Sequence, residues 1–245
     1  MDFTLSQTFG DGLYFVTFID DHSRKLWVYV LKTNDQVLGV FKQFQVIVER
    51  ETGKKLKCVR TDNNGEYCGP FDEYCRQQGI RQKKTSPKTP QLNGLAKRMN
   101  RTLMERVRCL LSKAKLSGSF WGEALYTVAH VINLCSVVVL HVDVLERVWY
   151  GKDVSYSHLR VFGCKAFEHV PKDERSKLDV KTRECIFIGY GHDDIGYRFY
   201  DPVEKKIVRS HDVIFVEDQT IEDIGKTGKS ESLSIDNVVD FDPAP

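Results

Sequence analysis

The chain has 245 residues, enough for one or two domains with a core that needs neither disulfides nor a metal to hold it. Hydrophobic residues make up 41% and charged residues 29%, which is typical of a globular protein. The seven cysteines are odd in number and none stands in a C-x-x-C pair, so they exclude a disulfide framework and a zinc knuckle and predict reduced thiols. No apolar run is long enough for a signal peptide or a membrane span, so we expect no membrane partner.

The net charge of +2 conceals opposite charges in two parts of the chain. Residues 81–115 contain eleven Lys or Arg and one acid, Glu105, whereas residues 217–245 contain eight acids and two lysines. A basic excess of this size is typical of a surface that binds the phosphates of a nucleic acid. The alternative interpretation is a solvated helix face.

Strand and helix patterns alternate in the first half of the chain. Residues 13–20 and 26–31 are rich in aromatic and β-branched types and predict a hairpin around a polar turn. Asp35 is a candidate cap for a helix to about Thr52, because apolar residues recur there at helical spacing. The elements expected next are a strand at 56–60, a helix at 71–78, a loop at 85–94, a helix at 95–114 and a helix at 121–134. This order predicts an α/β core over residues 1–135.

Short strand patterns replace the helices in the second half of the chain. Residues 136–154 are expected to be a connector, and residues 155–217 a small all-β module, either a barrel or a sandwich. The expected strands of this module lie at 159–167, 185–190, 196–200, 207–209 and 213–216. Residues 218–245 are acidic and rich in Ser and Asp, which predicts a disordered tail.

Four sequence motifs carry a family resemblance. They lie at residues 14–24 (YFVTFIDDHSR), 60–67 (RTDNNGEY), 89–102 (TPQLNGLAKRMNRT) and 120–124 (FWGEA). In these motifs and their order the chain resembles the integrase region of copia-type LTR retrotransposons of plants, from about residue 8 to about residue 217. The resemblance implies a ribonuclease-H-like fold for the core, truncated at its N-terminus, and an SH3-like fold for the module.

The resemblance also implies a chemistry, DNA integration, and a set of residues for it. The family uses Asp, Asp and Glu to hold two Mg²⁺ (or Mn²⁺) ions that activate a water or a DNA 3′-hydroxyl. Such ions, about 3.5–4 Å apart, clamp the attacking and leaving oxygens and prefer carboxylate ligands. The second Asp of the family matches Asp62, which the resemblance therefore makes a catalytic and metal-binding candidate. On the sequence alone, an Asp in this D-N-x-G context is also a common turn former.

Lys97 stands where the family has its Glu, in Asn93-Gly94-Leu95-Ala96-Lys97. The 34 residues between Asp62 and Lys97 are close to the family's separation, so the alignment has not slipped. A charged ammonium has no lone pair to offer Mg²⁺, and like charges 4 Å apart repel by about 4 kcal/mol at an effective dielectric near 20. Glu105 cannot replace the lost Glu, because eight residues along a helix span about 12 Å. We therefore expect an impaired or inactive catalytic site.

The first Asp of the family precedes the strand that begins near Tyr14. Only Asp2 can supply it here, and Asp2 is a few residues closer to Tyr14 than the family's Asp. Asp20 and Asp21 lie at the hairpin turn and are interpreted as turn residues. Because this first strand is central in the family's fold, its shortening is expected to weaken both the sheet and the site.

The basic residues remain as a candidate DNA-binding surface. They are Lys83, Lys84 and Lys88 in an approach loop, and Arg98, Arg101, Arg106 and Arg108 on the long helix. Such residues position DNA on its phosphates without reading its sequence. Three alternatives remain open: a non-catalytic nucleic-acid-binding module based on the basic helix at 95–116, a protein-interaction module, or a pseudogene product without a stable fold. The resemblance implies DNA as partner and a homo-oligomer, and a nuclear or cytoplasmic location follows from the DNA substrate alone.

Overall fold

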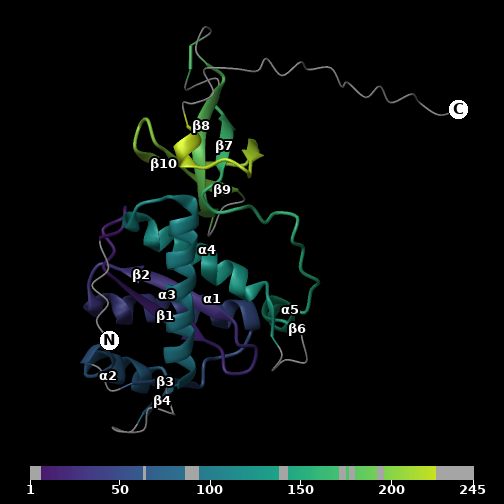
Figure 1. Cartoon of the computed structure of the whole chain (residues 1–245). Coiled ribbons are helices and arrows are strands. Elements are labelled where there is room, and N and C mark those ends of the chain that lie inside the picture. Colours follow the sequence, from purple (N-terminus) through teal and green to yellow (C-terminus); the bar gives the residue numbers. More distant parts are fainter. Residues whose placement is uncertain are drawn as a thin grey trace, which may run out of the picture.

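The computed structural model comprises α/β elements followed by a five-stranded sheet (Figure 1). It describes residues 7–62, 65–85, 94–137, 143–170, 175–176, 180–191 and 196–224. Two candidate residues from the sequence, Asp2 and Lys88, lie outside these ranges, as does the expected acidic tail beyond residue 224.

The predicted hairpin is present as β1 (Tyr14–Ile19) and β2 (Leu26–Leu31), paired antiparallel with Tyr14 opposite Leu31. Its turn is built by Asp20, whose Oδ2 accepts hydrogen bonds from the backbone N–H groups of His22 and Ser23 and from the Ser23 hydroxyl. Asp21 pairs with Arg24 at 2.9 Å on the surface. Both aspartates are therefore turn residues, as the sequence indicated.

The outer edge of β2 is covered by side chains of α4 (Trp121–Asn133). The Asn133 amide donates to the Leu26 carbonyl at 2.8 Å and accepts from the Leu26 N–H at 2.9 Å. The Tyr126 hydroxyl accepts from the Val30 N–H at 3.1 Å. These contacts satisfy backbone groups that an edge strand would otherwise expose.

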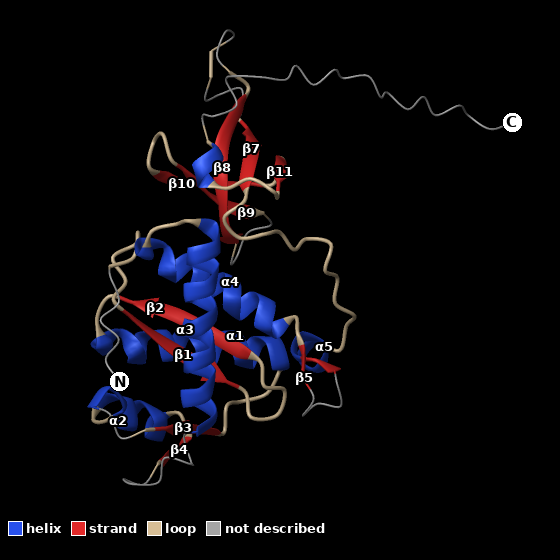
Figure 2. Cartoon of the chain, in the orientation of Figure 1, coloured by secondary structure: helices blue, strands red, loops and turns tan. Residues whose placement is uncertain are grey.

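Helices cover both faces of the hairpin (Figure 2). Alternate β1 residues point to opposite sides, so Val16 and Phe18 pack in the cluster of α1 (Val37–Thr52), while Phe15 and Ile19 pack against the α3 and α4 cluster. The η1 turn (Asn34–Gln36) precedes α1, which ends where Gly53 adopts φ 65°. The helix predicted to end near Thr52 is thus confirmed, but Asp35 is not its cap: Asp35 lies within η1, and Gln36 occupies the N-cap position of α1.

The next elements form a second, separate strand pair. They are β3 (Cys58–Thr61), η2 (Gly65–Tyr67), α2 (Pro70–Gln77) and β4 (Arg81–Lys84), with β4 parallel to β3. The placement of Lys83 and Lys84 in an approach loop was wrong, because both belong to β4. Within the described residues no ladder joins β3–β4 to β1–β2.

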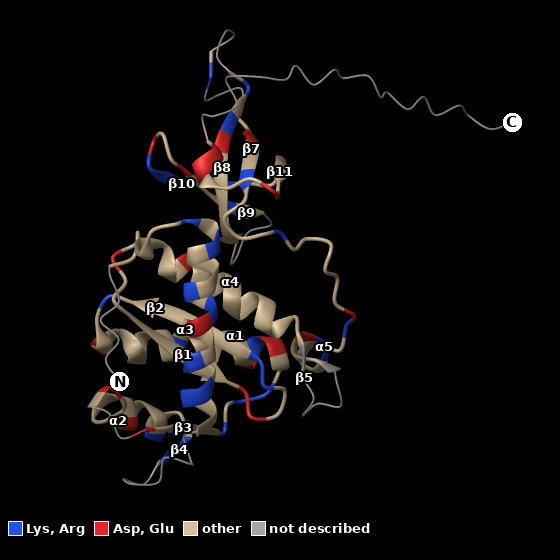
Figure 3. Cartoon of the chain, in the orientation of Figure 1, with Lys and Arg blue, Asp and Glu red and all other residues tan. Residues whose placement is uncertain are grey.

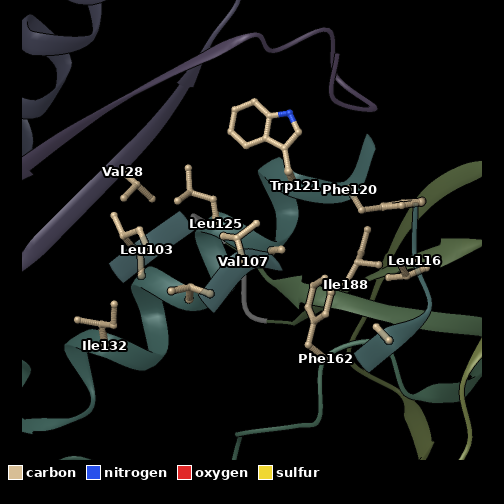
Figure 4. Close-up of a cluster of buried hydrophobic side chains, with 14 of the residues drawn as sticks. Val28, Leu103, Val107, Leu116, Phe120, Trp121, Leu125, Ile132, Phe162 and Ile188 are labelled. Atoms are coloured by element: carbon tan, nitrogen blue, oxygen red, sulfur yellow. The ribbon is translucent and has the colours of Figure 1, made fainter. Parts of the chain in front are cut away.

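The long basic helix is α3 (Gly94–Ala114), followed by η4 (Gly118–Phe120) and α4. The inner sides of both helices pack in one cluster that contains Leu103, Val107, Trp121 and Leu125 (Figure 4). Leu103 and Leu125 are fully buried, as expected for the apolar sides of two amphipathic helices that pack together.

The expected connector contains regular structure that the sequence did not predict. It includes β5 (Ser136–Val137), β6 (Asp143–Val144) and α5 (Leu145–Tyr150). Trp149 and Tyr150 donate hydrogen bonds to the carboxylate of Glu51 at the end of α1, at 2.9 and 3.1 Å. The buried ammonium of Lys25 lies 3.8 Å from the centre of the Tyr150 ring. These contacts attach α5 to the core.

The module is a five-stranded antiparallel sheet in the order β10-β9-β8-β7-β11. The strands are β7 (Lys165–His169), β8 (Thr182–Tyr190), β9 (Tyr197–Asp201), β10 (Lys206–Ser210) and β11 (Val213–Val216). The strand expected at 159–167 begins only at Lys165, because residues before it form turns that include Gly163 at φ 82°. Ordered structure also extends past residue 218 through η7 (Ile221–Asp223), and Ile221 and Ile224 pack against the α3–α4 cluster.

The module and the core share that hydrophobic cluster. Ile186 and Ile188 of β8, both fully buried, pack against α3 and α4 together with Phe162. Arg198 of β9 makes two contacts to the carboxylate of Glu123 on α4, at 2.7 and 3.0 Å. Burial raises the pKa of Glu123, and the guanidinium of Arg198 opposes that rise. The sheet is therefore docked on α4 by apolar packing and a largely buried ion pair.

This shared cluster predicts that module and core unfold together. Replacing Ile188 with Ala is expected to cost about 2–5 kcal/mol, because it leaves a cavity in the cluster. All three tryptophans lie in residues 1–150 and none lies in the module, so tryptophan fluorescence follows the core and the connector. We expect Ile188→Ala to lower the melting temperature seen by fluorescence and by circular dichroism equally. Val203→Ala is the control, because Val203 is 82% exposed, and it should change neither of the two melting temperatures. A core transition that Ile188→Ala leaves unmoved would contradict the prediction.

Candidate functional site

Asp62 directly follows β3, at the carboxyl end of that strand. Its side chain is half-buried and its Oδ1 atom is buried. Ligands of α/β sheets bind outside the carboxyl ends of strands, so Asp62 stands where a side chain of such a sheet can meet a ligand.

Neighbouring polar side chains hold the chain around Asp62 in place. The Gln82 amide of β4 donates to the Thr61 hydroxyl and to the Tyr67 carbonyl, both at 3.0 Å. Burial raises the pKa of Tyr67, and the carboxylates of Asp62 and Glu66 raise it further. The Tyr67 phenol is therefore a neutral group beside the Asp62 carboxylate. The sequence had not singled out Gln82 or Tyr67, because nothing in it showed that residues 81–84 pair with residues 58–61.

Lys97 lies in the first turn of α3 and is exposed to solvent. One turn further along, Asn100 Oδ1 accepts a hydrogen bond from the Thr17 hydroxyl of β1 at 2.9 Å. This contact fixes the start of α3 against the hairpin. An exposed Lys at position 97 leaves the helix unaffected, since Lys is a good helix former.

The described residues do not fit the two-metal centre that the family resemblance implied. Among them, no three or more His, Cys, Asp or Glu side chains are grouped so that they could hold a metal ion. Asp20 and Asp21 are committed to the hairpin turn, and Asp2 lies outside the described ranges. Asp62 alone supplies too few hard oxygen ligands for Mg²⁺. We therefore derive no catalytic step through metal at this site.

The basic candidates fall into two groups (Figure 3). Four exposed residues share the outer face of α3, within about 100° of its circumference at 3.6 residues per turn: Lys97, Arg98, Arg101 and Arg108. Arg106 is exposed on a neighbouring side of the helix. The remaining described candidates, Lys83 and Lys84, belong to β4. The structure thus places most of the basic candidates of α3 on one face of that helix.

Arg101 and Lys84 are each paired with an acid. Arg101 contacts Glu105 at 2.9 Å, and Lys84 contacts Asp72 at 2.7 Å and the Cys68 sulfur at 3.6 Å. The hydrogen bond to Asp72 is the main cause that raises the pKa of Lys84. Exposed pairs of this kind contribute little to stability, but a paired cation has less charge to offer a phosphate.

No helix in the described part of the chain is long and apolar enough to cross a membrane.

The chain matches two protein families along its length. Residues 1–90 match the family described as an integrase core domain, and residues 164–229 match the retroviral polymerase SH3-like domain. A Pol polyprotein from the tobacco (Nicotiana tabacum) transposon TNT 1-94 is 59% identical over 214 residues. These residues make up 87% of this chain and 16% of the polyprotein.

A second Pol polyprotein gives the same assignment at lower identity. A Pol polyprotein from the Arabidopsis thaliana transposon RE1 is 33% identical over 177 residues, which are 72% of this chain and 12% of that protein. The chain therefore spans less than one fifth of both polyproteins. The catalytic core domain of HTLV-2 integrase, solved in complex with magnesium in a trimeric form, is 19% identical. That alignment covers 54% of this chain and 82% of the HTLV-2 domain, with a TM-score of 0.42.

The Gln82 contacts predict a local contribution to stability. Gln82→Leu keeps the size of the side chain but leaves the Thr61 hydroxyl and the Tyr67 carbonyl without their amide donor. We expect a loss of about 1–3 kcal/mol, measured by urea unfolding. Gln77→Leu is the matched control, because Gln77 bonds only to Glu73 on the surface. Equal losses of stability in the two variants would show that the hydrogen bonds of Gln82 to Thr61 and Tyr67 do not stabilise the segment around Asp62.

Proposed function

The chain belongs to the retrotransposon Pol polyproteins of the plant type, and on this premise we propose that it binds DNA along α3 but is impaired or inactive in strand transfer. The observation that carries the proposal is Lys97, an exposed cation at the position of the family's third carboxylate. The chain contains an integrase core domain and an SH3-like domain, as the family matches show.

The impairment follows from charge. In relatives the third carboxylate would help to bind Mg²⁺ or Mn²⁺, and the bound ions would activate the attacking oxygen. A protonated Lys offers three N–H donors and no acceptor, so it cannot act as a ligand. Its repulsion of a cation about 4 Å away is several kcal/mol at an effective dielectric of 20, which also weakens any metal binding at Asp62.

Retention of DNA binding is supported by the outer face of α3. Residues 97 to 108 span about 16 Å along the helix axis, which corresponds to about five nucleotide steps of 3.4 Å. Arg98 and Arg108 at the two ends of this face are exposed. Contacts from such a row go to phosphates, so we expect binding that is independent of sequence and sensitive to salt. By the same family relationship we propose a homo-oligomer as the working form and the nucleus as the place of action.

A strand-transfer and nicking assay with Mg²⁺ or Mn²⁺ tests the catalytic part of the proposal. We expect the unchanged chain to be silent, because its metal ligands are incomplete. Lys97→Glu should recover activity if the remaining ligands are adequate, whereas Lys97→Gln, which removes the charge without adding a ligand, should not. Adding Asp62→Asn to Lys97→Glu should abolish the recovery. Activity in the unchanged chain that Asp62→Asn abolishes would refute the impairment, whereas activity that Asp62→Asn leaves unaltered does not come from this site.

A salt titration tests the binding part. The slope of log K against log salt is about −0.9 for each phosphate neutralised on duplex DNA, so Arg98→Ala and Arg108→Ala should each reduce its magnitude by about one. Lys152→Ala, an equal charge change at an exposed residue of the connector, is the control and should leave the slope unchanged. Affinity for a duplex oligonucleotide can be followed by fluorescence anisotropy. A common loss in all three variants would show that net charge, and not the α3 face, governs binding.

A further inference from the structure

Two histidines meet where the module joins the core. His130 lies near the end of α4, and His158 lies in the segment that leads into the module. Their Nε2 atoms are 3.1 Å apart. Both side chains are half-buried, so the pair remains in reach of solvent. The Tyr190 ring of β8 lies 4.4 Å from the His130 ring and 5.8 Å from that of His158.

We propose that His130 and His158 form a binding site for a divalent cation of the zinc class, which would link α4 to the segment before the module. The proposal is independent of the Asp62 and Lys97 site, and neither histidine takes part in the DNA-binding face of α3. The protein supplies two imidazole ligands, and water completes the coordination on the open side.

The distance between the nitrogens fits this use. With Zn–N bonds of about 2.0–2.1 Å, two bound nitrogens are about 2.9 Å apart at a right angle and about 3.3 Å apart at the tetrahedral angle. The observed 3.1 Å falls between these limits. A cation can therefore be held by both nitrogens once each ring turns its Nε2 lone pair from the other nitrogen toward the cation.

The surroundings hold both rings in position. Tyr197 donates a hydrogen bond to the carbonyl of His158 at 3.2 Å, and the backbone N–H of Arg160 donates to the Tyr190 hydroxyl at 3.1 Å. These contacts fix the backbone near His158 and the ring that packs on both imidazoles. A bound cation gains affinity from ligands held in place before it arrives.

Protons balance when the cation replaces the hydrogen bond. In the neutral pair one imidazole carries its proton on Nε2 and the other accepts it. When the metal binds, the imidazole that had donated from Nε2 carries its proton on Nδ1 instead. The Nε2 lone pairs of both rings then face the metal. No oxidation or other reactant is required, and imidazole suits zinc, copper and nickel better than Mg²⁺.

Binding would stabilise the folded chain, because the two histidines come together only when the module is docked on α4. A ligand that binds the folded state alone adds stability in proportion to the logarithm of its concentration. At a zinc concentration a hundredfold above the dissociation constant, the melting temperature of the full chain is expected to rise by about 5–10 °C.

The test is thermal unfolding of the full chain with and without Zn²⁺, with Mg²⁺ as the ion control. His130→Ala and His158→Ala should each remove the zinc-dependent rise. His22→Ala, which removes an exposed histidine of the hairpin turn, should retain it. A rise that survives either substitution at the pair, or no rise in the unchanged chain, overturns the proposal.

A second measurement needs no variant and so does not depend on how the substitutions affect folding. One equivalent of Cu²⁺ added to the unchanged chain should give an electron paramagnetic resonance spectrum with hyperfine coupling to two imidazole nitrogens. Coupling to a single nitrogen would place the ion on an isolated surface histidine and would overturn the site.

Discussion

The packing of α4 between the β1–β2 hairpin and strand β8 is the constraint on which the structure depends. Asn133 and Tyr126 satisfy the outer edge of β2, while Leu125 is buried in the cluster that also receives Ile188. Glu123 adds a bidentate contact to Arg198 across the same interface. Because α4 packs against the hairpin on one side and β8 on the other, a substitution that loosens one of these contacts is expected to weaken the other. Close-packed interiors have few voids that could absorb such a change.

This use of α4 accounts for the stability of a core whose strands are not joined in one described sheet. β1 packs against other residues on both faces, with Val16 and Phe18 buried on one face and Phe15 and Ile19 half-buried on the other, yet its described ladder is with β2 alone. Much of the burial that holds the hairpin therefore comes from α1, α3 and α4. The module contributes by covering the far side of α4, so the SH3-like sheet serves as part of the core's packing.

The fold and a metal centre place different demands on the residue at position 97. An exposed residue in the first turn of α3 can be Lys or Glu with little effect on packing, since no core contact depends on it. A metal centre does not share that tolerance, because a change from carboxylate to ammonium reverses the charge at a ligand position. The scaffold, the turn around Asp62 and the basic face of α3 are therefore compatible with the proposed loss of the reaction.

The sequence by itself determined the elements whose signals are local. β1, β2, α1, α3 and α4 follow from periodicity and terminating residues. The roles considered for Asp62 and Lys97 rest on the resemblance of the motifs to a family and not on these local signals. The sequence did not predict β4, whose RQKK residues have no apolar alternation and pair only because α2 returns the chain beside β3. Nor did it give α5 or the docking of β8 on α4. Periodicity fixes which face of an element is apolar, whereas only the tertiary structure decides which two faces, and which two histidines, meet.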